Sequence, residues 1–141
     1  MFKYLKVSIW LLCLFLFGCT TNNKPLLIHF SKDSSAIVIT NIEPAGLFQL
    51  KNNINTDTTY QNLVSVLQTP TDDDSTSMEV EWPGKLSIIG DSLLFTPANP
   101  FVKGKSYLIE TMLNVQFAKG EEIVKSNVGH AVKAQQQMLK R

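Results

Sequence analysis

The feature that most constrains the fold is a pair of apolar segments on either side of Gly90-Asp91. Residues 85–89 and 92–96 flank this dipeptide, and a glycine in the first central position is typical of a type II′ turn. The twist of that turn matches the twist of paired antiparallel strands, so the two segments are predicted to form a β-hairpin. Its opposed apolar pairs are Leu86 with Phe95 and Ile88 with Leu93. Because side chains alternate along a strand, all four belong to one face.

A second strong signal is the alternation of side chains between residues 107 and 117. Every second residue is suited to a core, whereas most of those between them are polar. The core-facing set is Tyr107, Ile109, Thr111, Leu113, Val115 and Phe117. A shift of one residue would turn this set to the wrong face, so the segment is predicted to be a strand of well-specified register.

Other short segments have strand-like composition with turn residues between them. They span residues 26–30, 36–42, 63–68, 78–82 and 121–125. In 78–82, Met78, Val80 and Trp82 are predicted to face the core, while Glu79 and Glu81 face water. Residues 47–53 fit either a helical turn or a strand end, and 131–141 fit a frayed strand, a short helix or disorder. Without a convincing amphipathic helix, this pattern predicts an all-β antiparallel sandwich.

Composition narrows the function classes. The 141 residues suffice for one domain of ordinary size. With 44% apolar and 18% charged residues, the chain is expected to fold. Its 13 basic residues are nearly balanced by 12 acidic ones, so there is no basic surplus to neutralise phosphates, and nucleic acid is not an expected partner.

The first residues have the pattern of a signal peptide. Lys3 and Lys6 precede the short apolar run 7–17, which is too short to span a bilayer. The run ends at Leu16-Phe17-Gly18-Cys19, which resembles the lipobox of bacterial lipoproteins through Leu16, Gly18 and Cys19. The resemblance implies that residues 1–18 are removed, that Cys19 is lipidated, and that 19–24 form a tether. The alternative is an ordinary secretory signal with a chance cysteine.

This leader sets the expected compartment. The lipobox implies a lipid anchor in the cell envelope, at the outer membrane, with the exposed face undetermined. The remaining cysteine, Cys13, would leave with the leader, so no disulfide is expected and the fold must depend on its core. Cleavage also removes two basic residues and no acidic one. Charge alone is therefore not expected to attract the mature chain to anionic headgroups.

A further resemblance concerns the folded part. Residues 80–109 resemble the C-terminal half of bacterial Ig-like domains, and a short segment resembles their beginning. The matching residues are Leu93, Phe95, Pro97, Pro100, Gly104 and Tyr107, with Ile28, Phe30 and Ser31 at the start. The resemblance implies an Ig-like β-sandwich over 25–133, followed by a tail over 134–141. It also implies that Tyr107 is a structural tyrosine corner, with its hydroxyl bound to upstream backbone and its ring in the core.

Metal and catalytic motifs are weak or missing in the sequence. His29 and His130 are isolated histidines. Asp72, Asp74 and Thr76 have the spacing of a calcium loop, but Ser77 and Pro83 replace its glycine and its final glutamate. Glu79 and Glu81 share one strand face, unlike a glycosidase pair, and no nucleophile elbow or phosphate-binding loop occurs. No metal, cofactor or enzymatic activity is predicted.

The function expected from these features is that of a non-catalytic binding or spacer module in an envelope assembly. Its partner would be an envelope protein or a glycan. Edge pairing through residues 63–68 or through the tail is one expected mode of binding. The alternative is a small carbohydrate-binding accessory lipoprotein with Trp82, Phe101 and Tyr60 as its aromatic platform. Phe101, in the loop that contains Pro97 and Pro100, is then the predicted exposed contact, while Trp82 is predicted to pack in the core.

Overall fold

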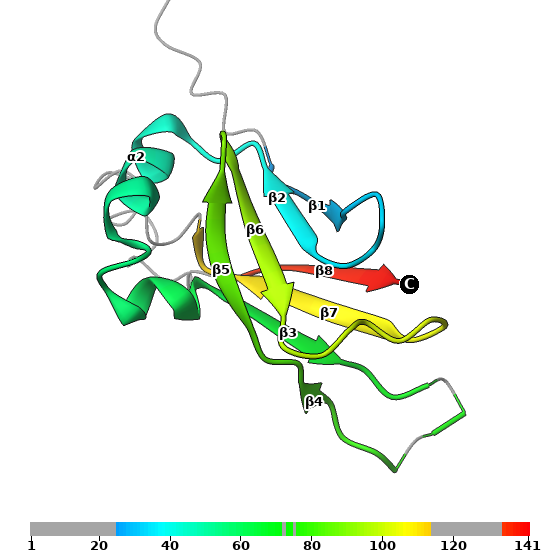
Figure 1. Ribbon diagram of the computed structural model, residues 1–141. Helices are drawn as coiled ribbons and strands as arrows, with labels where there is room; N and C mark the ends of the chain where they lie inside the picture. Colours follow the sequence, from blue (N-terminus) through cyan, green and yellow to red (C-terminus); the bar gives the residue numbers. More distant parts are fainter. Residues whose placement is uncertain (1–24, 72, 75, 114–133) are drawn as a thin grey trace, which may run out of the picture.

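Two antiparallel four-stranded sheets pack face to face in the computed structural model, which describes residues 25–71, 73–74, 76–113 and 134–141 (Figure 1). The strand orders are β1-β2-β6-β5 and β4-β3-β7-β8. The strands are β1 (Leu27–Phe30), β2 (Ile37–Thr40), β3 (Val64–Gln68), β4 (Val80–Glu81), β5 (Gly84–Ile89), β6 (Ser92–Pro97), β7 (Ser106–Thr111) and β8 (Gln135–Lys140). The predicted all-β antiparallel sandwich is confirmed.

The β5–β6 hairpin has the predicted register. Leu86 lies opposite Phe95, and Ile88 lies opposite Leu93. Gly90 has a φ of 60°, whereas Asp91 is not at positive φ, as a type II′ turn requires. Turn chemistry and apolar alternation therefore specify the same pairing. The hairpin joins the rest of its sheet through β6, which pairs with β2.

The strand orders give the sandwich its Ig-like topology. An Ig domain places strands A, B, E and D in one sheet and C, F and G in the other. Here β1, β2, β6 and β5 correspond to A, B, E and D, while β3, β7 and β8 correspond to C, F and G. The short β4 lies beside β3, where some Ig domains have an additional strand. The predicted tail 134–141, for which a frayed strand was one of the open interpretations, contains β8 at the position of strand G.

The core lies between the two sheets. The first sheet contributes the fully buried Ile37, Ile39 and Leu93, and the second contributes Val66 and Ile109. Along β7 and just beyond it, the predicted inward set is buried as far as it is described. Its described members are Tyr107, Ile109, Thr111 and Leu113. Val115, Phe117 and the predicted strand 121–125 lie outside the described residues.

The connection from β2 to β3 is helical, so the helical one of the two interpretations of residues 47–53 is the correct one, over a longer stretch than a single turn. It contains α2 (Pro44–Asn53) and the 3-10 helix η2 (Thr58–Leu63). Pro44 lies at the start of α2, where proline is favoured because its fixed φ suits a helix and its missing N–H is not needed. Leu47 and Leu50 face inward, and Leu50 belongs to the core cluster. Packing onto the sandwich therefore stabilises a helix whose own amphipathic pattern is weak.

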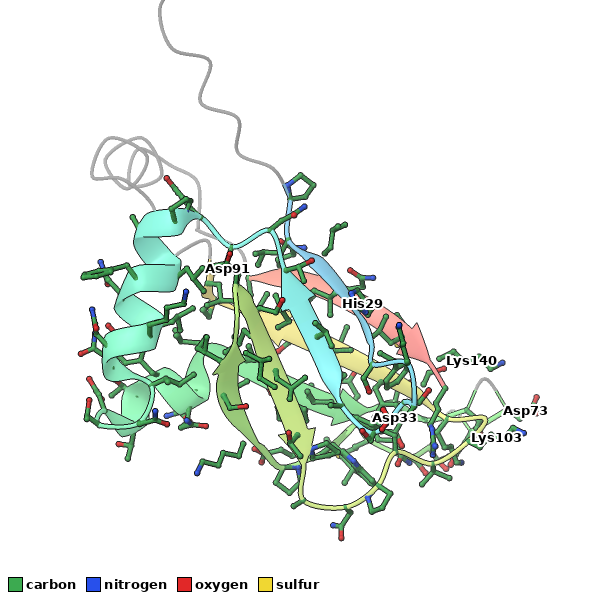
Figure 2. The ribbon with its side chains drawn as sticks, turned by 45° about the horizontal axis from the view of Figure 1, so that its top comes forward. His29, Asp33, Asp73, Asp91, Lys103 and Lys140 are labelled. Atoms are coloured by element: carbon green, nitrogen blue, oxygen red, sulfur yellow. The ribbon has the colours of Figure 1, made fainter. Side chains whose placement is uncertain are left out.

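The two ends of the sandwich differ in what they present. The entry end comprises Pro25, α2, the Gly90-Asp91 turn and the start of β8. The far end comprises the turn 31–36, the segment 69–83, the loop 98–105 and Arg141. Figure 2 shows Asp91 at the entry end, whereas Asp33, Asp73, Lys103 and Lys140 gather at the far end. The chain thus enters the sandwich at one end, and most of the described charged side chains lie toward the other.

Candidate binding surfaces

Phe101, the predicted exposed contact, is buried, and that expectation is wrong. Only 1% of Phe101 is exposed. Its ring centroid lies 4.8 Å from that of Tyr107 and 5.1 Å from that of Phe30, both in edge-to-face arrangements. The loop 98–105, which contains Phe101, folds back over the far end of the core. A glycan or protein therefore cannot contact this side chain unless the core opens.

Tyr107 explains why that loop folds back. The backbone N–H of Val102 donates a 2.8 Å hydrogen bond to the Tyr107 hydroxyl, and the Tyr107 ring is fully buried. Tyr107 opens β7, the equivalent of strand F, so its position and its bond to upstream backbone are those of a tyrosine corner. The carbonyl of Phe101 also accepts a hydrogen bond from the Arg141 guanidinium. The loop is thus attached to the core and to the end of β8.

The other two platform aromatics do not form an open surface with Phe101. Trp82 is half-buried and packs against the core, as predicted, with its ring centroid 5.5 Å from that of Tyr107. Its indole N–H donates a 3.0 Å bond to the carbonyl of Asn99. Tyr60 packs against the core from η2, and its hydroxyl lies 3.4 Å from the Asn53 amide. The three residues contribute to packing and to loop closure.

The segment that leads into β4 exposes apolar side chains, contrary to prediction. Met78 is 85% exposed and Val80 is 58% exposed, while Glu79 and Glu81 are exposed beside them. β4 pairs only with the last two residues of β3. Trp82 is the first residue of this segment that packs against the core, so the apolar side chains of Met78 and Val80 before it remain exposed. We call residues 76–81 the arm (Figure 1).

One edge of the first sheet is closed by a glutamine that the sequence analysis did not single out. The carboxamide of Gln61 accepts a 2.8 Å bond from the N–H of Leu86 and donates a 3.2 Å bond to its carbonyl. It also donates to the carbonyl of Ile54. Gln61 thereby replaces one residue of a neighbouring strand beside β5. An edge occupied in this way is a poor template for another chain.

The opposite edge of the same sheet is closed by β8. The Gln135 side chain donates a 3.1 Å bond to the carbonyl of Leu26, and Gln137 donates a 3.0 Å bond to that of Ile28. These bonds link β8 to β1 and so join the two sheets along one side. Residues 63–68, one of the two predicted binding edges, lie between β7 and β4 instead. β4 is the short edge strand of the second sheet, and it forms the end of the arm.

The aspartates of the turns have local partners. Asp33 accepts hydrogen bonds from the hydroxyls of Ser31 and Ser35 and from the N–H of Ser35, which together lower its pKa to about 2. Bonds from Ser77 and Thr76 lower the pKa of Asp74 to about 2 in the same way. The Asp74 carboxylate thus closes its own turn. Asp72, its predicted calcium-loop companion, lies outside the described residues.

No group of three or more histidine, cysteine or acidic side chains is placed to hold a metal ion within the described ranges. His29 is exposed, and its Nδ1 lies 2.9 Å from the carbonyl of Phe30. A shallow hollow of about 400 Å³ lies between the α2–η2 connection and the start of β5. Its rim includes Asp57 and Lys85. The Asp57 carboxylate is already engaged by Thr59, which lowers its pKa.

The predicted lipidation site Cys19, with Leu16 and Gly18, lies outside the described residues, as does His130. Among the helices that the structure describes, none is long and apolar enough to cross a membrane. No protein-family model matches the chain, and no curated protein or solved structure matches it either. The binding surfaces are therefore assessed from the chain's own geometry.

Proposed function

We propose that the protein is a lipid-anchored, non-catalytic Ig-like module of a bacterial cell envelope that binds a partner through the arm at its far end. The lipobox-like segment Leu16-Phe17-Gly18-Cys19 supports the anchor. The observation that carries the binding role is the exposure of Met78 and Val80 beside an edge strand. Exposed large apolar residues at an edge mark sites of strand addition.

The kind of partner follows from the chemistry of the arm. An extended segment laid along β4 would gain main-chain hydrogen bonds, and its side chains would meet every second residue of the arm. Met78 and Val80 offer apolar contacts, while Glu79 and Glu81 offer negative charge. A partner segment that alternates apolar and basic residues fits both. The glycan alternative is not carried forward, because its predicted contact, Phe101, is buried.

The anchor is tested by metabolic labelling with an alkyne fatty acid. The wild-type protein is expected to incorporate the label, and the Cys19→Ala variant is expected to lose it. Unlabelled wild-type protein would contradict the anchor. The secretory alternative predicts that result together with release of the protein from membranes.

The arm is tested by a photo-crosslinking amino acid placed at Met78 in intact cells. A discrete adduct is expected, and Val80→Lys in the same chain should abolish it by placing a cation where an apolar contact is needed. The same crosslinker at Lys32, in an exposed far-end turn, is the matched control. Equal adducts at both positions, or an adduct unaffected by Val80→Lys, would exclude the arm as the binding surface.

A further inference from the structure

Apolar side chains from four elements gather at the entry end. Among the described residues, the exposed large apolar side chains at this end are Leu27 of β1, Phe48 of α2, Ile89 before the turn and Met112 just after β7. Phe48 is the most exposed of them, at 68%. Single exposed apolar residues are common on proteins. Four exposed apolar residues at the end where the chain enters the sandwich indicate a surface that another molecule covers.

Four described charged residues lie at or near the entry end: Lys51 of α2, Asp91 of the turn, Glu43 before α2 and Glu110 near the end of β7. Lys51 of α2 and Asp91 of the turn form an ion pair with a 3.0 Å separation, so these two charges offset each other. The described charged residues of the far end are Lys32, Asp33, Asp73, Asp74, Glu79, Glu81, Lys103, Lys105, Lys140 and Arg141. Most of the described charged side chains therefore lie toward the far end, where Figure 2 labels Asp33, Asp73, Lys103 and Lys140.

The tether decides which of these ends lies near a membrane. The six residues 19–24 separate the predicted lipidated cysteine from Pro25, and six residues span at most about 20 Å when extended. Because Pro25 is at the entry end, a lipid anchor at Cys19 holds that end within about 20 Å of the bilayer. Confinement at this distance raises the local concentration of lipid, so weak apolar contacts suffice for docking.

We propose that the entry end docks on the lipid surface, with Phe48 and Ile89 in the interfacial region. Interfacial binding increases with the apolar area buried at the headgroup boundary. The described charged residues of the entry end, Glu43, Lys51, Asp91 and Glu110, include no basic surplus that would draw this end to anionic lipid. This orientation rests on the proposed anchor and directs the arm away from the membrane, toward a partner. In this orientation the bilayer fixes the direction in which the arm points.

The test uses full-length lipoprotein reconstituted in phosphatidylethanolamine–phosphatidylglycerol vesicles. The sequence has cysteines only at positions 13 and 19, so after processing and acylation Phe48→Cys supplies a unique thiol for a bimane label. Ile89→Cys provides a second entry-end site, and Met78→Cys is the exposed far-end control. Quenching is measured with doxyl-labelled lipid and with aqueous iodide.

Labels at positions 48 and 89 are expected to be quenched several-fold more strongly by doxyl lipid than the label at 78, and to be shielded from iodide. Full access to iodide without lipid quenching would overturn the docking. Shielding from both quenchers would also overturn it, because protein rather than lipid would then cover this end. Protein that fails to remain with the vesicles would instead contradict the lipid anchor, and the proposed orientation, which rests on that anchor, would then be excluded as well.

Discussion

Tyr107 combines a buried ring with a hydroxyl that organises a loop. Tyr107→Phe keeps the ring and leaves the N–H of Val102 without its acceptor. We expect a loss of about 1–2 kcal/mol in the free energy of unfolding, measured by urea denaturation. Tyr60→Phe is the matched control, since its hydroxyl lies at 3.4 Å from its partner. Equal stability of the two variants would show that the corner contributes nothing.

Phe101 shows why a single residue can be misassigned from sequence. It lies directly after Pro100 in a loop, where no periodicity indicates which side chains point inward. Its burial depends on tertiary partners: the Tyr107 hydroxyl, the Arg141 guanidinium and the ring of Phe30. Loss of partner binding in Phe101→Ala would therefore report loss of folding, because removing a buried aromatic costs about 3–5 kcal/mol.

The lowered pKa of Asp33 predicts how the free energy of unfolding depends on pH. Its pKa is about 2 in the folded protein and near its ordinary value of about 4 in the unfolded chain. The unfolded state thus binds a proton first as the pH falls. The stabilisation due to Asp33 is complete above pH ~4 and is lost as the pH falls toward ~2. Asp33→Asn should flatten this part of a stability–pH curve measured by urea denaturation.

The control for Asp33→Asn is Asp73→Asn, which removes the same charge from an exposed loop position. An unchanged slope between pH ~4 and ~2 in Asp33→Asn would contradict the proposed source of the acid sensitivity. Asp74 has a similarly low pKa, so the single variant should flatten the curve only in part.

Individual elements depend on how their edges are closed. Gln61 occupies the edge of β5 by bonding both backbone groups of Leu86. Gln61→Ala leaves these groups without that partner and should cost about 1–3 kcal/mol in the free energy of unfolding. Self-association should also increase, because β5 becomes an open edge. Gln49→Ala, on the exposed face of α2, should change neither denaturation nor light scattering.

The elements that sequence predicts are those whose local signals agree. The β5–β6 hairpin has matching turn chemistry and alternation, and β7 has an unambiguous inward face. α2 is concealed by Gly46 and a weak amphipathic pattern, although Pro44 is a start signal. β8 is concealed because Gln135 and Gln137 are polar yet point toward β1. Edge closure depends on residues distant in sequence, so no local pattern indicates it.

The whole sandwich depends on β8. This strand pairs with β7 over six positions from Ser106 to Thr111, and Leu139 packs against the core. Deletion of residues 135–141 should abolish cooperative unfolding, followed by near-ultraviolet circular dichroism. The double variant Gln136→Ala, Lys140→Ala changes only exposed side chains of β8 and should unfold cooperatively. A truncated protein that still unfolds cooperatively would show that residues 135–141 are dispensable.

The link between β1 and β8 also dictates an order of assembly. Gln135 and Gln137 bond to carbonyls 109 positions earlier in the chain. The carbonyls of Leu26 and Ile28 therefore lack these two hydrogen bonds until the ribosome has synthesised the chain as far as Gln137. Contacts so remote in sequence form slowly. If the proposed leader directs the chain through a secretion pore from its amino end, these two bonds can form only after residue 137 has followed.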